Sequence, residues 1–483
     1  MAKEVSPGVL ALRKVVDDVY ADAREAKKQG KLIGWSSSKF PCELAEAFDL
    51  NVMYPENQAA GIAAQRDGEI MCKAAEDLGF DNDICGYARI SLAYAAGKRA
   101  SRKLEKDENG KYTGKYVINP ATGKPLKDEN GNVVIDEATG KPKKDPKTQT
   151  PYIVLDDIHE IEALPEGEEK ELRLNAIQPY KQMRIPQPDF VLCCNNICNC
   201  MTKWYENIAR MCNIPLIMID VPYNNTVEVN DEYVDYIRSQ FDNAIVQLEK
   251  LTGKKFDKEK FDKACEHANR TAQNWLKVCN YLQYKPAPLS GFDLFNHMAD
   301  VVTARGKVQA AEAFEMLAQD LELNIKNGTS TLPFPEKYRV MFEGIPCWPK
   351  LPNLFKPLKE NGVNVTAVVY APAFGFVYNN YDEMVKAYCK APNSVCIEQG
   401  VAWREGICKE NKVDGVLVHY NRSCKPWSGY MAEMQRRFTE DLGIPCAGFD
   451  GDQADPRNFN EAQYLTRAQG LVEAMEQNKG RKN

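Results

Sequence analysis

The sequence predicts an α/β protein with two doubly wound, Rossmann- or flavodoxin-like parallel-sheet domains, joined by a helical segment and carrying a β-hairpin insertion. Two segments, residues 188–223 and 413–452, follow one plan: an apolar strand, a polar loop with cysteine, an amphipathic helix and a second strand. From about residue 230 to 330, the hydrophobic spacing is typical of amphipathic helices. The chain has 483 residues, which is too many for a single hydrophobic core.

These patterns divide the chain into three parts. We predict an N-terminal α/β domain over residues 1–230, a helical layer over residues 231–337 and a C-terminal α/β domain over residues 338–483. Within the first domain, residues 101–150 contain the sequences DENG and ATGKP twice each. Turn residues at this density predict hairpins that project from the surface, so we expect no catalytic residue there.

Composition and charge exclude several classes of function. The formal net charge is -6 with both signs mixed along the chain, so no broad cationic face is available for nucleic acid. The N-terminus lacks the apolar core of a signal peptide, and no stretch is apolar enough to span a bilayer. We therefore expect a cytoplasmic protein without a membrane partner. In a reducing compartment the 16 cysteines do not indicate a disulfide framework, and clustered thiols are better explained as metal ligands or reactive groups.

Four of these cysteines fall within eight positions, in the sequence CCNNICNC at residues 193–200. The cluster lacks the second pair of cysteines or histidines that a structural zinc site uses, so zinc is the weaker metal interpretation. An iron–sulfur cubane can instead take its thiolates from distant loops. The candidates lie at the start of predicted helices, whose amides stabilise a thiolate: Cys85, Cys198 and Cys424. The other clustered thiols are expected to pack the loop: Cys193, Cys194 and Cys200.

The surroundings of each candidate ligand are part of the prediction. Asn82 or Asp83 is expected to cap a helix that holds Cys85 in its first turn. Cys198 and Cys424 follow strands of the two repeated units, and we expect them at the sheet edge where doubly wound folds bind ligands. From spacing alone, the alternative that all three are idle, buried thiols stays open.

A second candidate site lies in the sequence GWSSSKFPCELAEAFDLNVMYPENQ, from residue 34 to 58. A short predicted strand ends at Trp35, three serines follow, and a helix is expected from Pro41 or Cys42. Hydroxyl and free amide groups ahead of a helix suit a thioester oxygen, a carboxylate or a phosphate. Glu56 follows a second predicted strand and is a candidate general base. The alternative is that the serines only cap the helix and that Glu56 is a surface charge.

Several stretches together resemble the 2-hydroxyacyl-CoA dehydratase family: GWSSSKFPCELAEAF, YPENQAAGIAA, DNDICGYARISLAYAAG, CCNNICNCMTKWYENIAR, GIPCWPKLPNLFKPL, APAFGFVYNN and DGVLVHYNRSCKPWSG. The resemblance covers essentially the whole chain and includes the hairpin insertion. It implies a lyase of anaerobic glutamate fermentation that dehydrates a 2-hydroxyacyl-CoA thioester. For the branch that these stretches match, the substrate would be (R)-2-hydroxyglutaryl-CoA and the product (E)-glutaconyl-CoA.

The resemblance also implies cofactors and partners. The chain would pair with a beta subunit of similar fold in an oxygen-sensitive heterodimer, in which each subunit holds a [4Fe-4S] cluster through three cysteines. A separate ATP-dependent iron–sulfur activator protein would inject one electron. FMN or riboflavin is associated with this branch of the family, but no residues in the sequence indicate its site. Carried onto this sequence, the cluster ligands fall on Cys85, Cys198 and Cys424, the substrate-side serine on Ser37 or Ser38, and the glutamate on Glu56.

The implied chemistry explains the need for a cluster. The proton to be lost is β to the thioester carbonyl, which does not acidify it. An added electron would give a ketyl radical anion that expels the α-hydroxyl, after which an ordinary carboxylate such as Glu56 suffices as base. Three thiolates would leave one iron open to bind a substrate oxygen.

Other roles stay open in the sequence. His419 and Lys425 flank the loop of Cys424 and are weaker candidates for electrostatic support. The distal carboxylate of the substrate would need an arginine or lysine, which the sequence does not identify. The alternative function is an electron-relay or scaffold subunit of an enzyme similar to benzoyl-CoA reductase.

Overall fold

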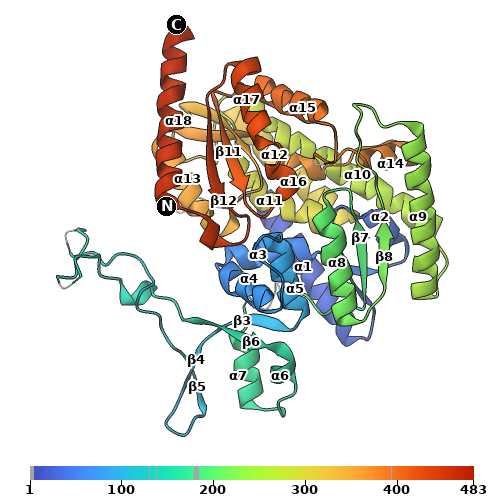
Figure 1. The fold of residues 1–483 in the computed structure, drawn as a ribbon, viewed down its shortest axis with the longest axis horizontal. Helices are drawn as coiled ribbons and strands as arrows, with labels where there is room; N and C mark the ends of the chain where they lie inside the picture. The colour runs from blue at the N-terminus through green and yellow to red at the C-terminus, as the bar shows by residue number, and fades with distance from the viewer. Residues whose placement is uncertain (1–4, 130, 138, 179–183, 393, 483) are drawn as a thin grey trace.

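The computed structural model describes residues 5–129, 131–137, 139–178, 184–392 and 394–482. Its main strands form two four-stranded, parallel sheets (Figure 1). The first sheet has the order β2 (Asn51–Met53), β1 (Ile33–Ser36), β7 (Phe190–Cys194) and β8 (Leu216–Ile219). The second has the order β10 (Val363–Val368), β9 (Tyr338–Glu343), β11 (Gly415–Asn421) and β12 (Cys446–Gly451). The predicted fold class is therefore confirmed.

An aspartate just before a central strand fixes the register of each sheet. Asp189 precedes β7 and accepts a hydrogen bond from Ile33 N at 2.8 Å. Asp414 precedes β11 and accepts one from Arg339 N at 2.9 Å. Both strands are buried along nearly their whole length, as expected where helices cover both faces of a parallel sheet. The two cysteine-bearing loops consequently leave equivalent ends of the two sheets.

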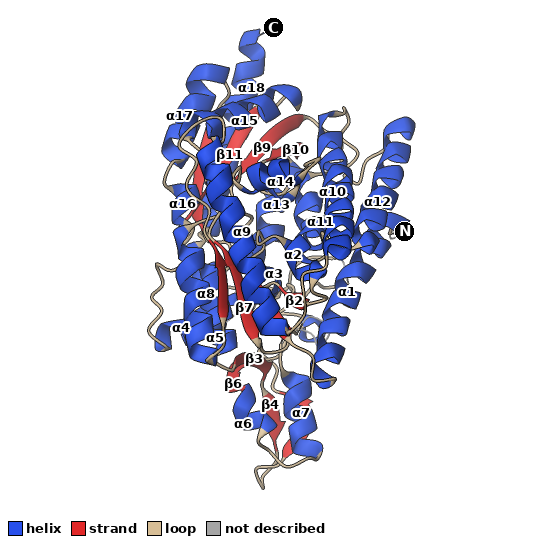
Figure 2. Cartoon of the chain, turned by 90° about the vertical axis from the view of Figure 1, so that its right-hand side faces the viewer, coloured by secondary structure: helices blue, strands red, loops and turns tan. Residues whose placement is uncertain are grey.

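Long helices connect the two sheets in sequence, as predicted: α9 (Asp231–Thr252), α10 (Lys258–Asn280), α11 (Gly291–Thr303) and α12 (Val308–Asn327). Side chains at the helix starts explain three of these boundaries. Asn230, Asp257 and Ser290 each accept a hydrogen bond from a backbone N–H of the first turn. The N-terminal helix α1 (Pro7–Lys28) packs beside α12 (Figure 2). The close approach requires glycine, because a Cβ on Gly8 would lie 2.4 Å from the Leu317 backbone.

The remaining helices of the body belong to its two halves. Those of the N-terminal half are α2 (Cys42–Ala47), α3 (Pro55–Ala64), α4 (Gly68–Asp77), α5 (Gly86–Ala95) and α8 (Asn199–Cys212). Those of the C-terminal half are α13 (Leu351–Glu360), α14 (Tyr381–Tyr388), α15 (Ile397–Glu410), α16 (Lys425–Ser428), α17 (Met431–Leu442) and α18 (Glu461–Lys482). The two predicted βαβ units are β7–α8–β8 and β11–α17–β12. Within the described ranges, every helix is too short or too polar to cross a membrane.

Most of the described chain between α5 and β7 extends away from the two sheets (Figure 1). Here β3 (Lys98–Arg102) pairs antiparallel with β6 (Ile153–Asp157), and β4 (Leu104–Lys106) pairs antiparallel with β5 (Tyr112–Tyr116). Two short helices follow: α6 (Ile158–Glu162) and α7 (Glu168–Ala176). Of the side chains that the structure describes between residues 102 and 150, none is buried. The predicted β-hairpin insertion is therefore present.

Candidate active site

Three thiols from distant parts of the chain line one cavity of about 70 Å³: Cys85, Cys198 and Cys424. Each is the N-cap residue of a helix: α5, α8 and α16 respectively. Cys198 and Cys424 follow the ends of β7 and β11, where the repeated plan predicts them. The fold thus brings thiols from both α/β units against the same cavity.

Cys85 is held differently from the prediction. It precedes α5 as the N-cap residue rather than lying in the first turn, and neither Asn82 nor Asp83 caps that helix, whose N-cap has no side-chain hydrogen bond. Instead, the Ser423 hydroxyl accepts a hydrogen bond from Gly86 N at 3.0 Å. A side chain of the second α/β unit therefore supplies a hydrogen-bond acceptor at the start of a helix of the first.

A fourth thiol, Cys200, also lines this cavity and is hydrogen-bonded to Cys85. We expected Cys193, Cys194 and Cys200 all to be packing residues. Cys193 and Cys194 are fully buried in β7, whereas Cys200 lies at the cavity. The sequence did contain a signal for the position of Cys200: it lies in the first turn of the helix that begins after Cys198, so helical geometry keeps the two thiols close.

The described His, Cys, Asp and Glu side chains include no group of three that could hold a single metal ion. This finding gives no support to the zinc interpretation. In a cubane each iron takes its own thiolate, so the protein sulfurs stand further apart than the ligands of one ion.

Burial controls the protonation of the three predicted ligands. The apolar surroundings disfavour a thiolate, so they raise the pKa of Cys198 and raise the pKa of Cys424 to about 12. The pKa of Cys85 is also raised, first by its hydrogen bond with Cys200 and then by burial. These effects outweigh the helix N-termini that the sequence indicated. The three groups are therefore thiols at neutral pH, and a bound metal would have to displace their protons.

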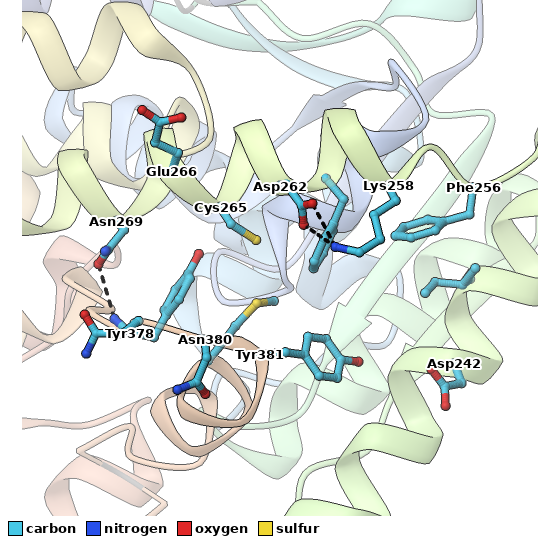
Figure 3. A pocket seen from close by; sticks show the side chains of 14 residues that line it. Asp242, Phe256, Lys258, Asp262, Cys265, Glu266, Asn269, Tyr378, Asn380 and Tyr381 are labelled. Atoms are coloured by element: carbon cyan, nitrogen blue, oxygen red, sulfur yellow. Dashed lines mark hydrogen bonds and ion pairs between the residues drawn. The ribbon is translucent and has the colours of Figure 1, made fainter.

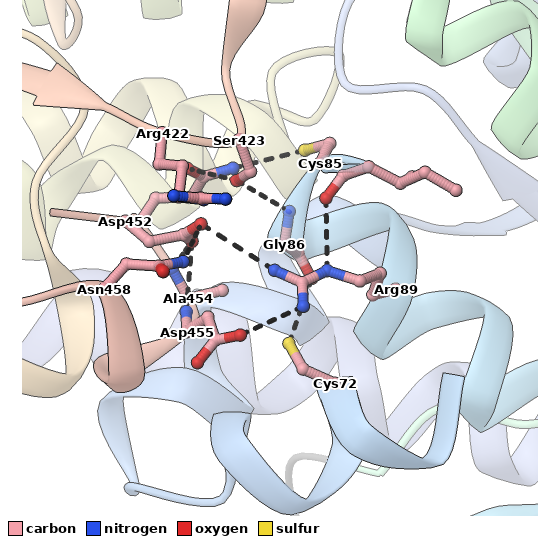
Figure 4. Close-up of polar contacts among 12 residues, drawn as sticks. Cys72, Cys85, Gly86, Arg89, Arg422, Ser423, Asp452, Ala454, Asp455 and Asn458 are labelled. Carbon is pink, nitrogen blue, oxygen red and sulfur yellow. Dashed lines mark hydrogen bonds and ion pairs between the residues drawn. The ribbon is translucent and has the colours of Figure 1, made fainter. Parts of the chain in front are cut away.

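A chain of hydrogen bonds from the second α/β unit fixes the Cys85 sulfur (Figure 4). Gln453 is fully buried, and its Nε2 donates to Cys85 Sγ at 3.2 Å. The Ser423 hydroxyl donates to Gln453 Oε1 at 3.3 Å and so sets the orientation of the amide. Both residues lie in loops at the strand ends of the second sheet, and sequence reasoning missed both.

Arg89 joins the same two regions through a buried ion-pair network (Figure 4). Its guanidinium is fully buried and donates to Glu76 on α4 at 2.8 Å and to Asp455 at 3.0 Å. Asp452 lies 3.8 Å from another nitrogen of the same group. Arg457 pairs with both Glu76 and Asp455. Because the two aspartates follow β12, the network holds α4 and α5 against the second α/β unit.

Glu56 and Ser38 form the second part of the site. Ser38 N and Ser38 Oγ donate to the two carboxylate oxygens of Glu56, each at 2.7 Å. Burial raises the pKa of Glu56, although the bonds from Ser38 and the charge of Lys39 act in the opposite direction. Glu56 lies in the first turn of α3 rather than at a strand end, because β2 already ends at Met53. The carboxylate therefore lines the thiol cavity from a helix start.

The structure separates the two candidate serines. Ser37 Oγ accepts a hydrogen bond from Cys194 N at 2.9 Å, and Ser37 N donates to Leu192 O at 2.9 Å. Ser37 thus joins the end of β1 to β7, whereas the Ser38 hydroxyl is directed at the carboxylate of Glu56.

The rest of the thiol cavity is largely apolar, with Ile197, Trp204, Ile345, Phe374 and Trp427 among its walls. Lys39 is the single cationic side chain among the described residues that line it, and it is only 3% exposed. Its place in the serine run gave no sign of this position. A further cavity of about 230 Å³, lined by Ser38, shares part of its wall with the thiol cavity.

A larger cavity of about 630 Å³ lies between α9, α10 and the start of α14 (Figure 3). Its walls carry aromatic rings together with the acids Asp242, Asp262 and Glu266. Lys258, the single lysine among its described lining residues, is paired with Asp262 at 2.7 Å. The predicted site residues all lie elsewhere, so the thiol cavity is the candidate active site.

His419 and Lys425 lie outside the described wall of the thiol cavity. His419 Nδ1 lies 2.6 Å from Ile345 O, and its ring stacks on Phe449 with the centroids 4.8 Å apart. Burial lowers the pKa of His419, so the ring is neutral. Lys425 is exposed, with its ammonium 3.6 Å from Asp83. Neither side chain therefore lies among the described residues that line the candidate active site.

The sequence is similar to a family of known proteins. Residues 170–475 match the family model described as 2-hydroxyglutaryl-CoA dehydratase, D-component. The chain is 73% identical, over 482 residues that span both proteins, to (R)-2-hydroxyglutaryl-CoA dehydratase subunit alpha of Acidaminococcus fermentans. It is 43% identical to the (R)-phenyllactyl-CoA dehydratase alpha subunit of Clostridium sporogenes, over 96% of this chain and 94% of the relative. It is 41% identical to the (R)-2-hydroxyisocaproyl-CoA dehydratase alpha subunit of Clostridioides difficile, over 97% of each chain.

We expect Arg89→Met to weaken the contact between the two α/β units, because the buried Asp452 would lose its neighbouring cation and the buried Asp455 would lose one of its two cationic partners. Breaking a buried pair of this kind costs about 3–5 kcal/mol of unfolding free energy. Denaturant unfolding followed by fluorescence measures the loss. Arg436→Met is the matched control, since Arg436 pairs only with Glu433 and Glu440 on the exposed surface of α17 and its loss should change little. Equal losses in the two variants would contradict the role of the network.

Proposed function

Because the chain belongs to the 2-hydroxyglutaryl-CoA dehydratase family, we propose that it is the alpha subunit of an enzyme that dehydrates (R)-2-hydroxyglutaryl-CoA to (E)-glutaconyl-CoA through a ketyl radical. The observation that carries the proposal is the meeting of thiols from both α/β units with Glu56 at one cavity. Ser38, bonded to Glu56, lines the cavity that adjoins it.

We assign a [4Fe-4S] cluster to Cys85, Cys198 and Cys424. The donor set fits the group, because soft thiolates select iron–sulfur clusters and these three thiols line the same cavity. When bound, the cluster would supply a single electron and an iron with an open position for a substrate oxygen. Cys200 would then remain outside the ligand set as the hydrogen-bond partner of Cys85.

FMN or riboflavin stays an expectation for the complex. The thiol cavity is assigned here to the cluster and the acyl chain of the substrate. The cavity of about 630 Å³ has acidic walls, which do not suit the phosphate of FMN. The part of the chain that the structure describes therefore assigns no flavin site.

The residues of this chain would move the proton and exclude water. The proton to be lost is β to the thioester carbonyl and becomes acidic only after one electron has been added. Glu56 would accept it, since burial raises the pKa of this carboxylate and makes it a stronger base than an exposed glutamate. Ser38 would hold Glu56 in place and present its hydroxyl to the substrate oxygen. The apolar walls would keep bulk water from the reacting atoms.

Two protein partners complete the proposal. The relatives are named as alpha subunits, which supports pairing of this chain with a beta subunit in a heterodimer. A separate ATP-dependent iron–sulfur activator protein would deliver the electron that starts turnover.

The first test is the reaction itself. The complex of this chain with its beta subunit, purified without oxygen and started by the activator with ATP and reductant, should form glutaconyl-CoA over many turnovers. Reductant should not be consumed in proportion to product, because dehydration is redox-neutral. Chromatography of the CoA esters and a count of electrons consumed provide the measurement. Two electrons consumed for each product molecule would instead indicate a reductase.

The second test is the metal content of the subunit. Cys85→Ala, Cys198→Ala and Cys424→Ala should each lower the bound iron and sulfide and remove the cluster's electron paramagnetic resonance signal. Cys200→Ala is the matched control, because it removes a thiol from the same cavity and should leave the iron content unchanged. Loss of iron in that control, with iron retained in Cys198→Ala, would overturn the proposed ligand set.

The third test separates the roles of Glu56, Ser38 and Ser37. Glu56→Gln should lower kcat by about 10²–10⁴-fold, the usual contribution of a general base, while iron content stays constant. Ser38→Ala should lower kcat less, because the backbone N–H of residue 38 still holds the carboxylate. Ser37→Ala is the control and should keep kcat near that of the unmodified enzyme. A Glu56→Gln enzyme with unchanged kcat would exclude Glu56 as the base.

A further inference from the structure

We propose that Lys39 binds the distal carboxylate of the substrate and thereby selects a dicarboxylic 2-hydroxyacyl thioester over one with an apolar side chain. The inference rests on the proposed function and deepens it, since it names the residue that would set the substrate class.

Lys39 is a buried basic side chain that forms no ion pair with any residue the structure describes. Its side chain is 3% exposed, and its ammonium lies 4.9 Å from the ring centroid of Phe374 and 5.3 Å from that of Phe376. Those aromatic faces attract the charge but do not neutralise it. Among the described residues, no carboxylate oxygen comes within ion-pair distance of this ammonium, although Glu56 lines the same cavity. A buried charge in this state gains from an anion that arrives with a ligand.

The proposed substrate has the complementary need. Its acyl chain ends in a carboxylate, which loses its water on entering a cavity walled by Ile197, Trp204 and Phe374. A buried carboxylate requires a cationic partner. Of the described residues that line the cavity, Lys39 alone has a basic side chain, which a carboxylate would hold in its charged form. The side chain of Lys39 and the distal carboxylate of the substrate are therefore complementary in charge.

Neighbouring charges favour this match over other assignments. Arg305 is also buried, but it donates to the Tyr388 hydroxyl at 3.0 Å, packs over Phe376 and lies outside the described cavity wall. Burial, with repulsion from Arg305 as the second cause, lowers the pKa of Lys39 to about 7. An incoming carboxylate offsets both effects and holds the ammonium in its charged form. On the proposed function, Ser38 and Glu56, which are bonded to each other, would serve the reacting end of the substrate and leave Lys39 for its far end.

The test compares two thioesters that differ in one group. In 2-hydroxypentanoyl-CoA a methyl group replaces the distal carboxylate of 2-hydroxyglutaryl-CoA. Lys39→Met retains the apolar stem of the side chain and removes its charge. We expect kcat/KM of the activated heterodimer for 2-hydroxyglutaryl-CoA to fall by on the order of 100-fold or more, as for loss of a buried charge pair. The value for 2-hydroxypentanoyl-CoA should change little or rise.

A second measurement uses conservative variants, in case Lys39→Met assembles poorly, and compares the binding of two product esters. Inhibition constants of glutaconyl-CoA and of 2-pentenoyl-CoA should differ in the unmodified enzyme, with glutaconyl-CoA bound more tightly, and Lys39→Arg should preserve that preference. Lys39→Gln should abolish it.

The outcomes separate this inference from the proposed function. If the unmodified enzyme dehydrates neither thioester, the proposed function fails and this inference fails with it. If the unmodified enzyme works and Lys39→Met lowers kcat/KM equally for both thioesters, Lys39 acts at the reacting centre. Only the carboxylate assignment is then overturned. No preference between the two product esters in the unmodified enzyme would overturn it as well.

Discussion

The docking of the two α/β units is the constraint on which the site depends. No single unit carries all three predicted ligands: Cys85 and Cys198 come from the N-terminal half and Cys424 from the C-terminal half. The Arg89 network makes one alignment of the units favourable, because Arg89 reaches Asp452 and Asp455 only when α5 meets the loop after β12. The same loop supplies the amide that holds the Cys85 sulfur. Interface and cavity are therefore built from the same few residues.

Burial opposes ionisation of the side chains that line the thiol cavity. Burial keeps Cys198 and Cys424 protonated and raises the pKa of Glu56. The same burial brings the pKa of Lys39 down to about 7. On our proposals, the thiols would gain a counter-charge from a bound metal and the lysine would gain one from an acyl carboxylate. Low polarity in the free protein and strong electrostatic contacts in the loaded protein thus follow from the same apolar walls.

Local sequence patterns predicted the parts of the site that local structure determines. The repeated strand–loop–helix plan located both βαβ units and placed Cys198 and Cys424 after their first strands. The residue pattern singled out the serine run and Glu56, but neither it nor the family resemblance could choose between Ser37 and Ser38, because adjacent serines in a loop carry no signal of direction. The cap of α5 by Ser423, the Gln453 bond to Cys85 and the position of Lys39 all depend on contacts between segments far apart in the chain. No spacing rule within one segment could have indicated them.

The positions of the thiols along the chain also determine when, relative to synthesis of the chain, the metal centre can be assembled. Cys85 is synthesised early and Cys424 late in a chain of 483 residues, and domains generally fold as they emerge from the ribosome. On the proposed ligand set, the first unit can be complete while its metal centre is still impossible to assemble. Iron delivery must then wait for nearly the whole polypeptide, so maturation factors would act on a finished, docked subunit rather than on a nascent one.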